Sequence, residues 1–482
     1  MLKLYYLLFK ILLALPIFGI LNSTLLNNFA KTQKIINDSL YLMISLICSV
    51  VLVCFTEYGR YDFYLFTMSR NVPLAFSANS FNLMFGIFLS LLILSFNTVF
   101  QSSFSRLNLD EKYKLYNIPV ATLYFLCILL SFSHSILLTL FIYASIIIAS
   151  YFIITNPDLR EFRIRYSVIF SASLIGVIIF MCMLGFYYKY TGNTFFTLQN
   201  TNKLNNISAY WLVFVFIILI ASNFCAPFYL IFQEKFYYED LLPVFTIFFI
   251  PFVFCNTFLF IKTAYFVFYT SIHNVDIYFF YTNFLVILLF FVACGFLIRH
   301  IKNNIKFPLL LGVSCFMIFL SQMLFINSNS ELVNIFSSFL LLMLCISLAV
   351  LTYSGVLFIL LKTGITDTNI LYENSKKELN FYTFCLLLPI LVLLISFFDL
   401  GLYNSKPIYF INLAEIFILF IVLIVHIFML ISKKVQNNPR IKLNITKKEK
   451  LKFFISQIGL LIIILFFFVL RNQVAKFILY YK

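Results

Sequence analysis

The sequence contains little charge. Only 11% of its 482 residues are Asp, Glu, Lys or Arg, whereas soluble domains have about 25%. So few charges cannot cover a globular surface, which excludes a soluble enzyme, a nucleic-acid-binding module and a disordered protein. Apolar residues make up 63% of the chain. They form runs of about 20 residues, long enough to cross a ~30 Å hydrocarbon core. Because a membrane barrel would show short alternating segments, these runs predict an all-α polytopic membrane protein.

Motifs for catalysis are also missing. The sequence has no Walker loop, GxGxxG, HExxH or GxSxG pattern, and no two of its ten cysteines form a CxxC pair. The cysteines lie in or beside apolar runs, which is typical of small buried apolar residues. We therefore expect no metal, no cofactor and no reaction catalysed by this chain alone. Glycine (12) and tryptophan (1) are scarce beside 65 Phe and 30 Tyr, a bias expected of an A+T-rich genome such as that of an organelle or a reduced bacterium.

Apolar runs separated by polar breaks predict about fourteen membrane spans in a single membrane domain, 1–482. The main interruptions, 57–80, 363–378 and 433–450, are too short to fold alone. Pro251 and Pro389 fall inside spans 8 and 12, where each is expected to kink or break the helix. The predicted spans are 3–22, 39–56, 81–101, 117–132, 133–155, 167–188, 209–231, 241–269, 277–298, 307–327, 333–361, 379–398, 408–432 and 451–472.

Basic residues indicate the orientation of these spans. The net charge is +16, and 23 of the 34 Lys and Arg fall on the side opposite the N-terminus, against 11 on the N-terminal side. Eight of the 23 lie between Lys433 and Lys452. The positive-inside rule then places this basic side on the cytoplasmic or matrix face, in contact with anionic lipid and not with nucleic acid.

Ionisable residues inside the hydrocarbon are the candidates for transport chemistry, because burying a charge there is costly and is usually retained for function. Glu415 and His426 both lie in span 13, eleven residues apart. Eleven steps of 100° return to within about 20°, so both side chains share one helix face, about 16 Å apart along the axis. They are either stations of a water-linked proton relay or residues that hydrogen-bond neighbouring helices without titrating.

Four further residues are weaker relay candidates. Asp399 and Lys406 precede span 13 and form either a loop salt bridge or a gating pair. His134 lies between spans 4 and 5, as a relay station or as a residue facing the interface. Lys262, near the end of span 8, is either a station or a side chain that snorkels to the headgroups.

One stretch resembles a known family. The segment APFYLIFQEKFYYEDLLPVFTIFF at 226–249 is similar to the PFHxWLPD, loop, PVS pattern of the antiporter-like subunits of respiratory complex I and the related Mrp antiporters. Pro227, Phe228, Pro243 and Val244 match in place. The order of features from about 133 to 430 also resembles this family, and subunit 2, the chain N type, fits best.

This resemblance implies an antiporter-like fold with two inverted five-helix repeats, at about 133–270 and 277–432. It also implies a non-catalytic membrane-arm subunit of the proton-translocating NADH:ubiquinone oxidoreductase, partnered by other membrane-arm subunits. The location implied is the mitochondrial inner membrane, or a bacterial inner membrane as the alternative. Redox energy would come from quinone reduction elsewhere in the complex.

The family's charged residues are mostly replaced in this chain. The helix 5 glutamate falls on Ala144 and the helix 7 lysine on Ser222, while only the helix 12 lysine has a possible counterpart, Lys406. The helix 8 position falls on Phe249, Val253 or Cys255, according to register. Two interpretations follow: the chain conducts protons through substitutes, or it supports the membrane arm structurally. A free-standing secondary ion transporter or lipid flippase is a third, from another class.

Overall fold

The computed structural model is mostly helical. It describes residues 2–26, 30–69, 72–104, 110–154, 276–299, 301, 307–323, 376–399 and 407–432, with scattered positions between 174 and 195, 255 and 262, 338 and 348, and 451 and 473. Expected spans 6, 7, 8 and 11 lie wholly or largely outside the described residues, and span 14 is described only in part. The total of about fourteen spans and the two five-helix repeats therefore remain predictions.

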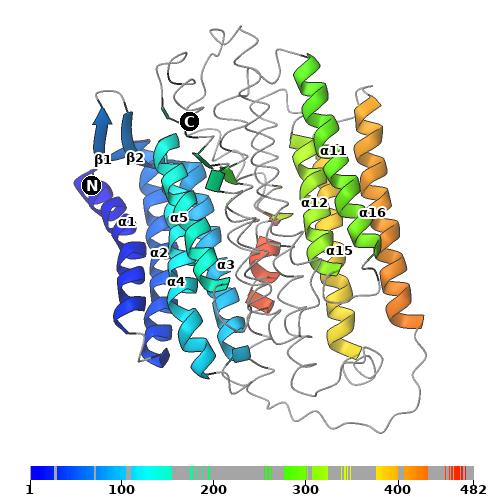
Figure 1. Cartoon of the computed structure of the whole chain (residues 1–482), viewed down its shortest axis with the longest axis horizontal. Helices are drawn as coiled ribbons and strands as arrows, with labels where there is room; N and C mark the ends of the chain where they lie inside the picture. The colour runs from blue at the N-terminus through cyan, green and yellow to red at the C-terminus, as the bar shows by residue number, and fades with distance from the viewer. Residues whose placement is uncertain are drawn as a thin grey trace.

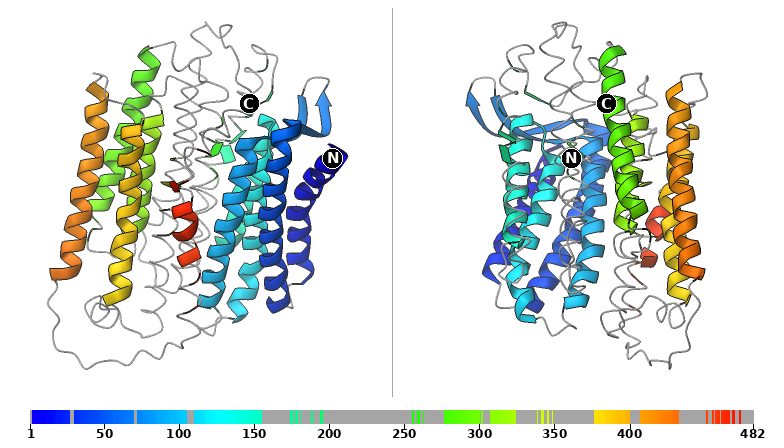
Figure 2. Two further views of the ribbon diagram at one scale, coloured as in Figure 1. Left: turned by 180° about the vertical axis from the view of Figure 1, so that it is seen from behind. Right: turned by 45° about the vertical axis from the view of Figure 1, so that its right-hand side comes forward.

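The described helices form two groups on opposite sides of the molecule (Figure 1; Figure 2, left). In the first group, α4 packs against α1, α3 and α5, and α2 packs against α1 and α3. In the second, α12 packs against α11, α15 and α16, and α15 packs against α16. The first group comprises α1 (Leu2–Leu25), α2 (Ala30–Tyr58), α3 (Ser80–Phe104), α4 (Asp110–Phe132) and α5 (Ile136–Ile154), and the second α11 (Asp276–Arg299), α12 (Phe307–Met323), α15 (Lys376–Asp399) and α16 (Pro407–Ser432).

Three described helices are long and apolar enough to cross a membrane: Leu2–Leu25, Thr32–Tyr58 and Phe410–Met429. The outer face of α16 is apolar and open, with Phe410, Phe417 and Phe428 exposed by 73%, 62% and 68%. Large aromatic side chains exposed along one helix face suit a hydrocarbon environment and not water. The chain is a membrane protein.

Several helices extend beyond the predicted spans. Helix α2 begins at Ala30, before the expected 39, and α4 begins at Asp110, before the expected 117. The 29 residues of α2 measure about 44 Å at 1.5 Å per residue, the thickness of a bilayer with its headgroup regions. The polar residues in the first turns of these helices thus lie in the headgroup region, and a hydropathy pattern does not include them in the predicted spans. Helix α15 runs unbroken through Pro389, so that proline does not break the helix and the alternative of a kink stays a prediction, while Pro251 lies outside the described residues.

The segment expected to be a loop at 57–80 contains a β-hairpin, so the all-α prediction is too strict. Strand β1 (Tyr61–Ser69) pairs antiparallel with β2 (Val72–Ala78), with Tyr61 opposite Ala78. Gly59, at φ +75°, ends α2 and turns the chain into β1. The ring of Tyr61 stacks on Tyr6 of α1 with centroids 4.2 Å apart. Aromatic contacts with α1, supplied by the tertiary structure, thus stabilise the strands.

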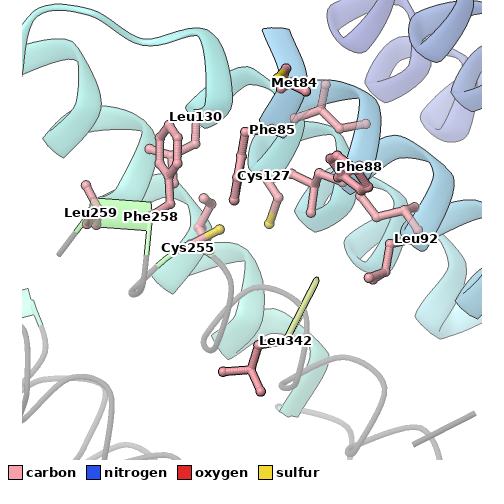
Figure 3. Close-up of a cluster of buried hydrophobic side chains, with 14 of the residues drawn as sticks. Met84, Phe85, Phe88, Leu92, Cys127, Leu130, Cys255, Phe258, Leu259 and Leu342 are labelled. Atoms are coloured by element: carbon pink, nitrogen blue, oxygen red, sulfur yellow. The ribbon is translucent and has the colours of Figure 1, made fainter. Parts of the chain in front are cut away.

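The apolar core of the first group includes positions from a distant part of the sequence (Figure 3). Phe258 stacks on Phe85 of α3 with centroids 4.3 Å apart, and Cys255 lies beside Cys127 of α4. Both thiols are fully buried. Seven of the eight described cysteines are buried, as expected for cysteines that act as small apolar residues.

Candidate functional site

Helix α16 carries polar side chains on an otherwise apolar buried face. Glu415 and His426 are exposed by only 1% and 0%, and both belong to this face, which confirms that they share one side of the helix. The spacing of three to four residues is that of a stripe facing the protein interior. The buried positions of α16 are Asn412, Glu415, Ile416, Leu419, Val422, Leu423 and His426.

Glu415 is buried without a hydrogen-bond partner in the described part of the chain: neither carboxylate oxygen accepts a hydrogen bond there. Its neighbour from α11 is Cys294, which interacts electrostatically with the carboxylate. An unsatisfied buried polar group costs about 1–3 kcal/mol, and more if it is charged. The site therefore holds a carboxyl group in a costly environment, one turn inside the start of the apolar span.

His426 is held in one orientation by two contacts. Its Nδ1–H donates to the backbone carbonyl of Ile301 over 2.7 Å, and its ring stacks on Phe307 at the start of α12, with centroids 3.6 Å apart and planes 6° apart. The Nδ1 hydrogen bond selects the tautomer that leaves Nε2 with a lone pair. Nε2 has no hydrogen-bond partner among the described residues, so it can accept a proton from a water or a mobile group.

Two buried polar pairs join α12 to α16 and α15, and a prediction based on ionisable residues alone does not include them. Ser321 of α12 donates from Oγ to Oδ1 of Asn412 over 2.8 Å. Ser396 of α15 donates from Oγ to Oε1 of Gln322 over 2.7 Å. All four side chains are at most 1% exposed. The occurrence of Asn and Gln inside apolar spans could have indicated these pairs, because buried amides require hydrogen-bond partners.

The pair Asp399 and Lys406 is only partly described. Asp399 is the last residue of α15, while Lys406 lies outside the described residues. The loop salt bridge and the gating pair both remain predictions. The basic segment at 433–450 likewise lies outside the described residues, so its contact with anionic lipid is also a prediction.

A second polar cluster lies where the hairpin meets the connection between α4 and α5. The backbone N–H groups of His134 and Ser135 donate to the carbonyl of Ala75 in β2, over 2.9 and 3.2 Å. Arg60 binds Asp62 through two hydrogen bonds of 2.8 and 2.9 Å and also donates to Nε2 of His134. The hairpin is thus attached to the helix connection by both backbone and side chains.

His134 acts in this cluster as a neutral acceptor. Its side chain is 1% exposed and stacks on Phe195, with ring centroids 4.9 Å apart. The residue lies in the connection between α4 and α5, outside both helices. Burial, together with the cations of Arg60 and Lys262, lowers the pKa of His134 to about 2. The imidazole is therefore uncharged at physiological pH and accepts the hydrogen bond from Arg60.

Lys262 does not snorkel to the headgroups. It is 3% exposed, its Nζ donates to the carbonyl of Ser133, and the ammonium lies 4.5 Å from the ring centroid of Phe258. A carbonyl and an aromatic face hold the ammonium inside the protein, which is why the snorkelling interpretation is wrong. His134 is likewise buried against the protein, and both interpretations of it, as a relay station and as a residue facing the interface, stay predictions.

The positions of the expected family charges are only partly described. Ala144 of α5 is partly buried and packs on the apolar core, and Cys255 is fully buried. Ser222, Phe249 and Val253 lie outside the described residues. The two described positions, Ala144 and Cys255, thus carry small apolar side chains where the resemblance would place charges.

No family model matches the sequence, and no curated protein matches it. Solved structures with a similar fold are membrane complexes. Respiratory complex I from Thermus thermophilus with bound NADH matches with a TM-score of 0.64 at 11% identity, over 96% of this chain and 99% of the other. The Mrp complex from Dietzia sp. DQ12-45-1b matches with a TM-score of 0.70 at 9% identity, over 97% of both chains.

An archaeal respiratory complex, the membrane-bound sulfane sulfur reductase, matches with a TM-score of 0.61 at 12% identity, over 97% of both chains. Identities this low show the fold alone. Each similar chain belongs to a multi-subunit membrane complex. The chain therefore has the fold of the antiporter-like membrane subunits of complex I and Mrp complexes along nearly its whole length.

Proposed function

We propose that the chain is a membrane-arm subunit of a proton-translocating NADH:quinone oxidoreductase, and that its second group of helices carries a proton-binding station at Glu415. The fold shared over nearly the whole chain with subunits of respiratory and antiporter complexes supports the first part. One observation carries the second: a buried carboxyl group without a hydrogen-bond partner in the described part of the chain.

The energetics favour a functional role for Glu415. An acidic residue inside a membrane helix is costly, by up to about 2.5–3.5 kcal/mol on insertion scales when it lies at the centre; Glu415, nearer the start of the span, has a smaller cost of the same kind. Glutamine would fill nearly the same volume without the option of a charge. A structural role would favour a carboxyl group satisfied by its neighbours, whereas a group that alternately binds and releases a proton cannot be permanently paired.

His426 is the second station of this proposal. It lies eleven residues beyond Glu415, about 16 Å along α16, beside the connection between α11 and α12. Its Nε2, which has no hydrogen-bond partner among the described residues, provides a proton acceptor near the end of the span. By the positive-inside prediction, this end faces the basic side of the membrane. Waters between the two stations would complete the path.

The first group of helices has a structural role in this proposal. His134 is neutral and committed to Arg60, and Ala144 offers no proton-binding group. We propose the subunit 2 type from the resemblance in the sequence, and the mitochondrial inner membrane from the composition bias towards Phe and Tyr; a bacterial inner membrane is the alternative.

A second candidate is a subunit of a cation/proton antiporter complex without redox activity, favoured by the TM-score of 0.70 with the Mrp complex. Native gels of solubilised source membranes separate the two candidates. We expect the chain to migrate with NADH:quinone reductase activity. A chain that migrates apart from this activity would favour the antiporter complex or a free-standing transporter.

The test of Glu415 is the proton/electron ratio of the purified complex in proteoliposomes. Glu415→Gln is expected to lower the ratio during NADH oxidation without dissociating the complex. Glu57→Gln is the matched control, because Glu57 lies exposed at the end of α2. An unchanged ratio in assembled Glu415→Gln complex would disprove the station.

A further inference from the structure

Two buried polar groups on α16 complement each other. Nδ2 of Asn412 is a buried donor without an acceptor among the described residues, and the Glu415 oxygens are buried acceptors without a donor there. Asn412 and Glu415 are three residues apart, so their side chains lie one turn apart on the same face, with Cβ atoms about 5–6 Å apart. Among the described residues, Asn412 thus lacks an acceptor and Glu415 lacks a donor on the same face of α16.

The orientation of the Asn412 amide follows from its other contact. Ser321 donates its hydroxyl to Oδ1 of Asn412 over 2.8 Å. Since Oδ1 is engaged with α12, Nδ2 is the end of the amide that remains for a neighbour on α16. Asn412 is 0% exposed, so bulk water does not reach its N–H groups. Ser321 therefore determines which end of the amide is available to a group near Glu415.

We propose that Asn412 and Glu415 bind a water molecule between them, and that Asn412 is a positioning residue for proton exchange at Glu415. The water accepts from Nδ2 of Asn412 and donates to a Glu415 oxygen, which gives it two polar partners, as buried waters require. A monovalent cation fits less well, because the N–H groups of the amide present partial positive charge to the site. This inference rests on the proposed function of Glu415.

Through Asn412, the water connects Glu415 of α16 to Ser321 of α12. The next residue of α12, Gln322, forms a second buried polar pair with Ser396 of α15. The amide of Asn412 transfers no proton itself. It holds the water in hydrogen-bond reach of the carboxyl group, so that the proton of Glu415 has a partner inside the protein.

The test combines transport with infrared spectroscopy on the purified complex in proteoliposomes. The C=O stretch of the Glu415 carboxyl group is the band that disappears in Glu415→Gln. In Asn412→Leu we expect this band at higher frequency, because a hydrogen bond to the carboxyl group is lost. We also expect proton translocation about tenfold slower, the effect of losing one ordinary hydrogen bond. Asn412→Ser, which retains a donor, should keep both values near those of the unmodified complex.

Asn22→Leu is the matched control. Asn22 is a buried amide in the first group, where Nδ2 donates to Asn37 over 3.3 Å, and its replacement should leave the Glu415 band unchanged. If Asn412→Leu does not assemble, Ser321→Ala carries the test. This variant removes only the hydroxyl that orients the amide and is expected to broaden the Glu415 band; an unchanged band would overturn the proposal.

The remaining outcomes separate this inference from the proposed function. In one outcome, Asn412→Leu changes neither the proton/electron ratio nor the Glu415 infrared band, while Glu415→Gln loses proton translocation. This outcome would disprove the bound water but would still support Glu415 as a proton-binding station. A shifted band with unchanged translocation would overturn the positioning role. Normal translocation in Glu415→Gln would disprove the station, whereas the band in Asn412→Leu would still test the water. Translocation that requires Na⁺ in place of choline would overturn the water in favour of a cation.

Discussion

The imidazole of His426 lies flat on the ring of Phe307, with centroids 3.6 Å apart and planes 6° apart. Together with the 2.7 Å hydrogen bond from Nδ1 to the carbonyl of Ile301, this contact fixes both the rotation of the ring and its tautomer. The connection between α11 and α12 thus holds a side chain of α16. A histidine held in this way presents Nε2 in one direction, as a proton acceptor in a relay requires.

His426→Ala is expected to lower the proton/electron ratio of the assembled complex, because it removes the acceptor near the end of the span. Phe307→Leu should lower the ratio less, since the ring loses its stacking partner but keeps its hydrogen bond. NADH oxidation with a pH-sensitive dye inside proteoliposomes measures both. Phe284→Leu is the control, because Phe284 on α11 is 57% exposed and far from this contact in sequence. An unchanged ratio in His426→Ala would exclude His426 from the relay.

The sequence predicted the features that depend on local periodicity. Each of the nine described helices corresponds to an expected span, because apolar runs of membrane length have few alternatives in a bilayer. The shared face of Glu415 and His426 follows from the geometry of a single helix. The burial of both side chains required the packing of α16 on its neighbours.

Features that depend on contacts between distant segments could not be predicted. The hairpin has no turn signature, and Tyr61 is ordered by Tyr6 from another helix. Lys262 donates a hydrogen bond to Ser133, which lies 129 residues earlier in the chain. The burial of Lys262 could therefore not be predicted from its position near the end of a span. Asn412 and Ser321, 91 residues apart, form a pair that only the packing of α12 on α16 brings together.

Gly19 allows α1 and α4 to approach closely. A Cβ added at Gly19 would overlap the ring of Phe125, which is fully buried. Gly19→Ala should therefore destabilise the chain by about 1–3 kcal/mol, the usual cost of overpacking. Thermal unfolding in detergent, followed by protease resistance of the N-terminal helices, measures this loss.

Gly295→Ala is the control for Gly19→Ala. Gly295 lies inside α11, and an added Cβ would meet none of the described residues within 4 Å. Alanine forms helices better than glycine by about 1 kcal/mol, so this variant should be neutral or slightly stabilising. Equal losses of stability in both variants would contradict the close packing of α1 on Phe125.

The cluster around His134 predicts an acid-sensitive hairpin. The pKa of His134 is lowered from 6.5 to about 2, first by burial and then by the cations of Arg60 and Lys262. Above pH 6.5 the imidazole is neutral in both the closed and the opened structure, and stability is independent of this group. Below pH 6.5 the opened structure binds a proton that the closed one does not, so opening becomes easier by at most about 1.4 kcal/mol per pH unit, until the pH approaches 2.

Hydrogen exchange of the peptide containing Ser133 to Ser135, corrected for the intrinsic rate, should therefore report an opening free energy that falls by about 2 kcal/mol between pH 6.5 and 5. His134→Gln keeps an acceptor for Arg60 but cannot be protonated, and its opening free energy should stay constant over this range. An equal pH dependence in both proteins would mean that another group controls the opening of the connection between α4 and α5.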